Sequence, residues 1–250
     1  MTSAGWTAIR AHCVRRLRHS DVVEPTDTTQ LTPPVGLGVW LADADPQDVI
    51  VHQAIPINRE WWDQELERLG LPSGTIVSDR PTRAMVFALA EAAQASAPDA
   101  ERLLWNAVAW GAGKKPRLIR KRIESLAADR TRLSELLRDA AVVSRSNPVD
   151  AYALLRPRDN AIKHLGPAFF TKFLYFAGGG NSDHPCCILD DRVAHSLQTA
   201  GWQSLPRRSD WWPSTYGRYM ELLTRWKKET DAARLDLIER YLFDANGNFG

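Results

Sequence analysis

The sequence predicts an all-α fold, and three observations support this prediction. Apolar residues recur at helical spacing along most of the chain after residue 58. Capping residues, glycine and proline stand near the ends of these periodic segments, and no internal repeat interrupts them. With 250 residues and 44% hydrophobic content, the chain can bury a full core as one large domain or as two small lobes.

Residues 1–57 are the exception to the helical pattern. Residues 19–57 contain five prolines, and the short runs VGLGVWLA and DVIVHQAI suggest a short pair of strands between loops. We therefore expect an irregular N-terminal segment over 1–57, packed on a helical domain over 58–250.

Capping residues and helix breakers set the expected helix boundaries. Asn58 suits the N-cap of the first helix, and Asp99 suits the N-cap of a helix that stops at Gly111. Asn147 followed by proline is a strong helix start, because proline fits the first turn. The predicted helices are 59–69, 82–96, 100–110, one from Pro116 with Ile119, Ile123 and Leu126 on one face, 130–143, 148–155, 158–164, 168–177, 191–200, 215–229 and 231–243.

Composition excludes several classes of protein. The net charge is +2, so any binding of nucleic acid must come from a local basic patch. Three cysteines exclude a disulfide framework and a four-cysteine iron–sulfur cluster, and they indicate a cytosolic protein. No apolar run has the length of a membrane span, and the first residues lack the apolar part of a signal peptide, so no membrane partner is expected.

One lysine, Lys172, lies inside the otherwise apolar run GPAFFTKFLYFAGG. Burial among aromatic side chains favours a neutral, nucleophilic amine. Downstream, in CILDDRV, Asp190 is placed to cap the helix at 191–200, where backbone N–H groups favour the carboxylate. An amine and a fixed carboxylate suit attack on an electrophilic carbon. Taken singly, a core lysine that reaches solvent and an aspartate that only caps a helix would explain them equally well.

The stretch LGPAFFTKFLYFA followed by ILDDRVAHSL resembles the helix–hairpin–helix DNA glycosylase superfamily, and most closely its 8-oxoguanine DNA glycosylase branch. Family members carry a hairpin of the form Leu-Pro-Gly-Val-Gly-Thr-Lys and, about twenty residues later, a Val-Asp-Thr-His-Val segment. Here Leu165–Lys172 takes the place of the hairpin, and Leu189–Val193 takes that of the aspartate segment. The second hairpin glycine is replaced by the Phe169-Phe170 region, and the histidine by Arg192.

The resemblance implies two helical lobes with a DNA-binding cleft, with the hairpin over 158–177 and the aspartate segment over 187–200. It implies that Lys172 attacks C1′ of a flipped nucleotide, expels the base and forms a Schiff base. Asp190 would stabilise the developing charge, and the adjacent Asp191 remains an alternative. The implied activity is a DNA glycosylase with AP-lyase activity on a damaged or modified base, first of all 8-oxoguanine.

No cofactor is implied, and the implied partner is double-stranded DNA with a modified base, bound by a monomer in the cytoplasm at the nucleoid. Repair and attack on modified foreign DNA, such as phage DNA, both remain open. The alternative is a catalytically silent helix–hairpin–helix module that binds or senses DNA.

Two groups of residues are expected to contact the DNA. The hairpin and the basic run GAGKKPRLIRKR, residues 111–122, should hold phosphates, although the run could equally be a solvated helix face. The expected phosphate contacts are Lys163, His164, Gly166, Ala168, Thr171, Lys114, Lys115 and Arg117.

The flipped base needs an aromatic surface on which to stack. The expected pocket residues are Phe169, Trp211, Trp212 and Phe243, with plain core packing as the alternative for each. No metal site is expected, because adjacent Cys186 and Cys187 with Asp183 and His184 would give poor tetrahedral geometry.

Overall fold

The structure is a computed structural model that describes residues 28–249, except 73, 115–116 and 209. Within these residues the regular elements are all helical, and one isolated bridge, between Ala54 and Thr82, is the only β pairing. The predicted all-α class is confirmed.

The elements that follow are named in chain order. They are η1 (Thr28–Gln30), α2 (Leu37–Asp43), η2 (Gln47–Val51), α3 (Arg59–Glu67), α4 (Arg83–Phe87), α5 (Ala90–Ala95), α6 (Ala97–Ala112), α7 (Ile119–Ala127), α8 (Arg130–Ser144), α9 (Pro148–Leu155), α10 (Pro167–Phe176), α11 (Asp191–Thr199), α12 (Pro213–Glu229) and α13 (Leu235–Ala245).

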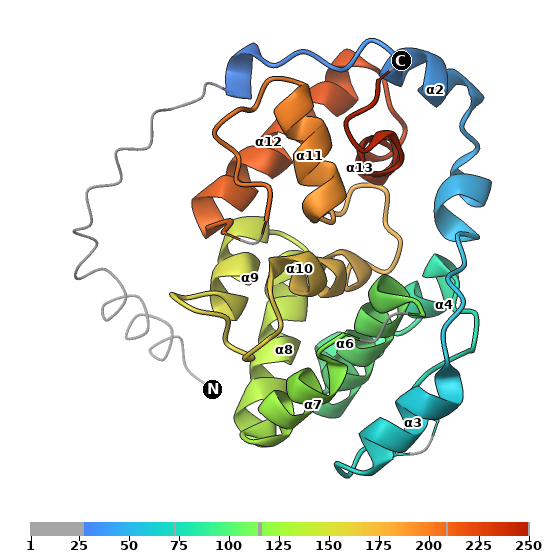
Figure 1. The fold of residues 1–250 in the computed structure, drawn as a ribbon, viewed down its shortest axis with the longest axis vertical. Helices are drawn as coiled ribbons and strands as arrows, with labels where there is room; N and C mark the ends of the chain where they lie inside the picture. The colour runs from blue at the N-terminus through green and yellow to red at the C-terminus, as the bar shows by residue number, and fades with distance from the viewer. Residues whose placement is uncertain (1–27, 73, 115–116, 209, 250) are drawn as a thin grey trace.

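The helices form two groups, with α10 between them (Figure 1). In the first group α6 packs on α5 and α8, and α8 packs on α7 and α9. In the second group α13 packs on α11 and α12, and the segment that precedes α3 lies against it, since η1 contacts α12 while α2 and η2 contact α13. Helix α10 packs on α6, α8 and α9 of the first group, and contact between α9 and α12 joins the two groups.

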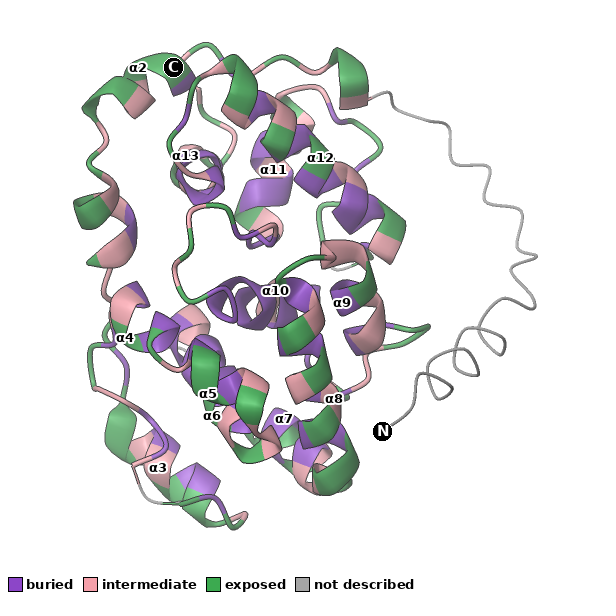
Figure 2. Cartoon of the chain, turned by 180° about the vertical axis from the view of Figure 1, so that it is seen from behind, coloured by how far each residue is buried: buried purple, intermediate pink, exposed green. Residues whose placement is uncertain are grey.

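Helix α10 lies in the core because its sequence, PAFFTKFLYF, is apolar on every side. Pro167 occupies the first turn, where its missing N–H costs nothing. Figure 2 shows the helix buried along most of its length, whereas the outer helices alternate between buried and exposed residues. Lys172 is therefore the one charged side chain of the buried helix α10.

Most of the described tryptophans fill the core. Trp62, Trp105, Trp202, Trp211 and Trp226 are each at most 1% exposed, whereas Trp212 is 49% exposed. The five buried tryptophans therefore pack in the core, as one of the two interpretations of the sequence expects.

The predicted strand pair is wrong. The run VGLGVWLA contains α2, which buries Leu37 and places Trp40 against Tyr241 at 5.8 Å between ring centroids. The run DVIVHQAI forms η2 and then an extended stretch with the single bridge at Ala54. Packing against α13 outweighs the weak strand preference of these residues. Residues 19–27 of the expected segment lie outside the described residues.

Three predicted N-caps are confirmed. The side chain of Asn58 accepts the Trp61 N–H at 3.1 Å, and that of Asn147 accepts the Asp150 N–H at 3.0 Å. Asp190 caps α11 as expected.

The helix predicted at 82–96 is divided into α4 and α5, and the next helix starts earlier than predicted. Ser96 caps α6 by accepting the Asp99 N–H at 3.2 Å, so Asp99 lies in the first turn and is not the cap. Gly111 lies inside α6, which ends at Gly113 with a φ of 56°. A serine three residues before an acid is the better start signal, because its short side chain reaches the third N–H.

The short helix predicted at 158–164 does not form. His164 has a left-handed backbone with a φ of 67°, and its carbonyl accepts the Arg122 Nε–H at 2.9 Å. A left-handed residue ends helical hydrogen bonding, so α9 is followed by a turn that leads into α10. The last helix begins at Leu235 instead of 231, because Asp231 also has a left-handed backbone. Pro116, the expected start of α7, lies outside the described residues.

Candidate active site

Lys172 and Asp190 lie in contact. The Lys172 side chain is 9% exposed, and its Nζ donates to Asp190 Oδ2 at 3.1 Å and to the carbonyl of Ala168 at 2.8 Å. The pair therefore joins the middle of α10 to the start of α11.

Helix capping orients the Asp190 carboxylate. Its Oδ1 accepts the backbone N–H groups of Arg192 at 3.2 Å and Val193 at 3.3 Å, which leaves Oδ2 for Lys172. Asp191 points elsewhere: its Oδ1 lies 3.6 Å from Arg207 Nε, and its side chain is 48% exposed. The geometry thus favours Asp190 over Asp191 as the partner of the amine.

Thr171 fixes the segment before Asp190 against α10. Its Oγ1 accepts the Leu189 N–H at 3.2 Å, and the residue is fully buried. In this structure the side chain of Thr171 positions the Leu189–Asp190 segment, and its expected contact with a DNA phosphate stays a prediction.

Gly111 allows α6 to approach Lys172. A Cβ placed on Gly111 would lie 2.5 Å from Lys172 Cδ, closer than such atoms pack. A glycine in the interior of a helix normally costs stability, and here it makes room for the lysine stem.

A cavity of about 180 Å³ opens beside the ion pair. It is lined by Gln53, Ile55, Arg83, Trp110, Gly111, Ala112, Gly113, Lys172, Ile188, Asp190, Glu239 and Phe243. The lining thus combines the amine and its carboxylate with two aromatic side chains and a set of polar side chains from η2's C-terminal flank, α4 and α13.

Sequence reasoning missed the polar side of this cavity. Arg83 donates from Nε to Gln53 Oε1 at 2.8 Å and from NH1 to the hydroxyl of Tyr175 at 2.7 Å. The same NH1 lies 3.5 Å from Glu239 Oε2. Burial raises the pKa of Glu239 to about 7, although Arg83 opposes this rise. One feature of the sequence could have revealed Glu239. It is an acid directly after Ile238 and three residues before Leu242, and so it lies on the apolar face of its helix.

A second layer of hydrogen bonds holds Arg83 in place. The hydroxyl of Tyr175 donates to Asp236 Oδ2 at 2.8 Å, and Arg234 binds both oxygens of the same carboxylate at 2.9 Å. Because Arg83, Tyr175 and Asp236 are all buried, this network fixes the polar wall of the cavity.

Of the four residues predicted to line the base pocket, one lines this cavity and three do not. Phe243 lines the cavity, and Arg192 stacks on its ring at 4.3 Å. Phe169 lies outside the lining, with Lys172 Nζ 5.9 Å from its ring centroid. Trp211 is buried, donates to the Pro206 carbonyl at 2.6 Å and is not among the residues that line the cavity. Trp212 is exposed, stacks with Arg156 and does not line the cavity.

The residues predicted to contact phosphates lie in two places, after the end of α6 and around the start of α10. Lys114 and Arg117 are exposed in the connection after α6, next to Gly113 of the cavity lining. Lys163 is exposed, and His164, Gly166 and Ala168 are partly exposed around the start of α10. Lys115 lies outside the described residues. Contact of these residues with DNA stays a prediction.

Residues 48–243 match the model of a family described as "Putative 8-oxoguanine DNA glycosylase OGG-like protein". The chain belongs to this family. A search of curated proteins and a search of solved structures each found no match. The matched residues include the ion pair and the whole cavity lining. A DNA glycosylase family implies DNA as the partner.

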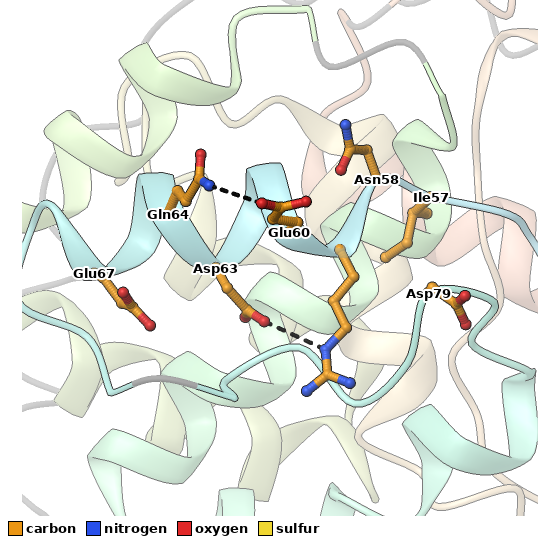
Figure 3. A pocket seen from close by; sticks show the side chains of 8 residues that line it. Ile57, Asn58, Glu60, Asp63, Gln64, Glu67 and Asp79 are labelled. Atoms are coloured by element: carbon orange, nitrogen blue, oxygen red, sulfur yellow. Dashed lines mark hydrogen bonds and ion pairs between the residues drawn. The ribbon is translucent and has the colours of Figure 1, made fainter.

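An open hollow of about 780 Å³ along α3 is larger than the cavity but does not suit DNA (Figure 3). Its acidic lining residues are Glu60, Asp63, Glu67 and Asp79. Figure 3 shows Gln64 bound to Glu60 within this lining, where Arg59 Nε also donates to Asp63 Oδ2 at 3.3 Å. An acidic surface repels phosphates, so this hollow is a weaker candidate for a DNA site than the cavity beside Lys172.

No three His, Cys, Asp or Glu side chains of the described residues are grouped as metal ligands. His184 Nε2 lies 2.8 Å from the Leu174 carbonyl, and burial lowers the pKa of His184 to about 4. Cys186 and Cys187 are buried in the core. None of the described helices combines the length and the apolar character that crossing a bilayer requires.

Proposed function

We propose that this OGG-like protein is a DNA glycosylase with associated AP-lyase activity that removes an oxidised purine, 8-oxoguanine, from duplex DNA. The observation that supports this proposal best is the 3.1 Å contact between Lys172 Nζ and Asp190 Oδ2 at the edge of a cavity. Neither group alone would indicate this chemistry, but a lysine amine beside a fixed carboxylate suits covalent catalysis.

The cavity suits a flipped base. Trp110 and Phe243 provide aromatic surface, and the polar side chains of Gln53, Arg83 and Glu239 can meet the edge of a purine. The glycosidic carbon of a stacked nucleotide is out of reach, so the nucleotide must leave the helix before reaction.

The reaction begins with the transfer of a proton from the Lys172 ammonium to water, because a protonated amine has no free electron pair. The neutral Nζ then attacks C1′, the C1′–N9 bond breaks, and its electron pair leaves with the base. Asp190 stabilises the positive charge that develops on the sugar, since its carboxylate is already held by two backbone N–H groups.

The AP-lyase step follows from the same covalent bond. The C1′–amine adduct opens to a Schiff base, loss of a C2′ proton drives elimination of the 3′ phosphate, and hydrolysis releases Lys172. The exposed side chains of Lys114, Arg117 and Lys163 hold the DNA backbone in this proposal and add affinity without reading the base.

Borohydride trapping tests the proposal directly. Reduction of the Schiff base should give a stable covalent adduct with a duplex that contains 8-oxoguanine, and none with an undamaged duplex. Binding of both duplexes without an adduct would support the catalytically silent module instead. A panel of duplexes with different modified bases then identifies the preferred base.

A further inference from the structure

Glu239 is a buried acid to which the chemistry above assigns no proton transfer. It lies on α13, is 1% exposed, and lines the same cavity as Lys172 and Asp190. Its position is unusual, because a buried glutamate is normally paired or hydrogen-bonded at both oxygens.

The Glu239 carboxyl group is incompletely satisfied. Its Oε2 has no hydrogen-bond partner among the described residues, and Arg83 NH1 stays 3.5 Å away while donating to Tyr175. A buried ionised carboxylate with a free oxygen is costly, whereas a carboxylic acid is not. The cavity therefore holds a carboxyl group that favours its protonated form.

The groups around Glu239 come from every element packed against it. They are Arg83, Tyr175, Lys172, Asp190, Asp236, Cys187 and Tyr219. Burial raises the pKa of Glu239 to about 7, and Asp190 and Asp236 raise it further, while Arg83 and Lys172 lower it. The acid is thus protonated in a large fraction of molecules near neutral pH.

We propose that Glu239 is a general acid that protonates the departing base, an inference that rests on the glycosylase function proposed above. As the C1′–N9 bond breaks, its electron pair goes to the base, and the Glu239 O–H proton passes to a base nitrogen or oxygen. Lys172 Nζ forms the new bond to C1′. The C1′-bound ammonium loses its extra proton to water, and the Glu239 carboxylate regains a proton from water, which restores the acid.

The two carboxyl groups of the cavity differ in a way that suits two roles. Asp190 accepts two backbone N–H groups and the Lys172 amine, so its charge is compensated. Glu239 has no such donors at Oε2. Two carboxyl groups in such different surroundings are typical of a site in which one group stabilises charge and the other transfers a proton.

The test uses Glu239→Gln, which keeps the size of the side chain and a hydrogen-bond donor but has no acidic proton. Release of 8-oxoguanine in a single turnover should fall by roughly 10²–10⁴-fold, as is typical for the loss of a general acid. Borohydride trapping on a preformed abasic site should remain at the wild-type level, because that substrate has no base to protonate. The loss of base release by the wild-type protein as the pH rises above about 7 should disappear in the variant.

Glu239→Asp and Glu101→Gln complete the design. Glu239→Asp retains an acid and should release base faster than Glu239→Gln. Glu101 is equally buried but lies on α6 in contact with Arg130, and Glu101→Gln should leave the ratio of base release to abasic-site trapping unchanged.

Three results would overturn the proposal. Undiminished base release by Glu239→Gln with an unchanged pH profile would make Glu239 a hydrogen-bonding contact to the base only. Equal loss of base release and abasic-site trapping would make its role structural. Absence of trapping by the wild-type protein on either substrate would remove the proposed glycosylase function itself, which is a distinguishable failure.

Discussion

Two hollows of this molecule differ in size and in chemistry. The hollow along α3 has a volume of about 780 Å³, and the cavity beside Lys172 has about 180 Å³. The larger one presents exposed acidic side chains, among them Glu60 and Glu67, on one side of a surface helix. The smaller one is lined by six separate stretches of chain and contains an amine, two carboxyl groups and a guanidinium.

This difference is why we propose the smaller cavity as the reactive site, since enclosure and fixed charge matter more to catalysis than volume does. Charges at an exposed surface are screened by water and salt, so neighbouring groups hardly perturb each other. In the enclosed cavity each charge is oriented by the backbone or by a buried partner, as Asp190 is by the start of α11. Preorganised groups of this kind can stabilise a transition state without reorganising.

The largest expected effect is that of Lys172→Gln. The amide keeps most of the side-chain volume but cannot form a Schiff base, so borohydride trapping should be abolished on every substrate. Binding of DNA, measured by fluorescence anisotropy, should stay close to that of the wild-type protein. Trapping that survives in this variant would remove Lys172 from the mechanism and the enclosed cavity from the active site.

Asp190→Asn should reduce base release by roughly 10²–10⁴-fold, because the neutral amide no longer compensates the charge on the sugar. Asparagine is an equally good N-cap, so the thermal stability of the protein should change little. Asp191→Asn is the matched control: its carboxylate lies near Arg207 and Arg208, and its loss should leave base release almost intact. The reverse order of the two variants would shift the catalytic carboxylate by one residue.

Gly111→Ala separates stability from activity. Alanine favours the helix, but its Cβ would force the Lys172 stem aside. A displacement of this size near the reacting atom can cost up to about 10²-fold in rate. We expect the melting temperature to stay level or to rise while trapping slows, as followed by calorimetry and timed borohydride quenching. An unchanged rate of trapping would show that Lys172 still reaches the substrate when its side chain is displaced.

The parts of the site that the sequence predicted are those set by local rules. The Asp190 cap needs only its neighbours, and the apolar surroundings of Lys172 are visible in ten consecutive residues. The pairing of the two was implied by a family resemblance, and the structure brings them to 3.1 Å. Helix class was predictable for the same reason, since periodicity is a local pattern.

The polar wall of the cavity could not be predicted in this way. Gln53, Arg83 and Glu239 come from three distant stretches of the chain and meet only through tertiary packing. The strand pair failed for a related reason: contact with α13 decides the structure of residues around α2, and that contact is not encoded in the short run itself. The sequence could not decide between core and pocket for Trp211, which is buried, because tryptophan suits a core and a stacking surface equally well.

The smallest expected effect concerns the surface near each hollow. Lys114 and Arg117 are exposed beside the cavity, so the double variant Lys114→Ala with Arg117→Ala should weaken binding to every duplex alike. Each lost phosphate contact should lower the slope of log affinity against log salt by about 0.9. Glu60→Gln with Glu67→Gln, on the α3 hollow, is the matched control, and its salt slope should equal that of the wild-type protein because DNA does not approach that face. An unchanged salt slope for the Lys114 and Arg117 variant would mean that these side chains are solvated and do not contact phosphates. A changed salt slope for the Glu60 and Glu67 variant would place DNA along α3 and make the α3 hollow the better candidate for the DNA site.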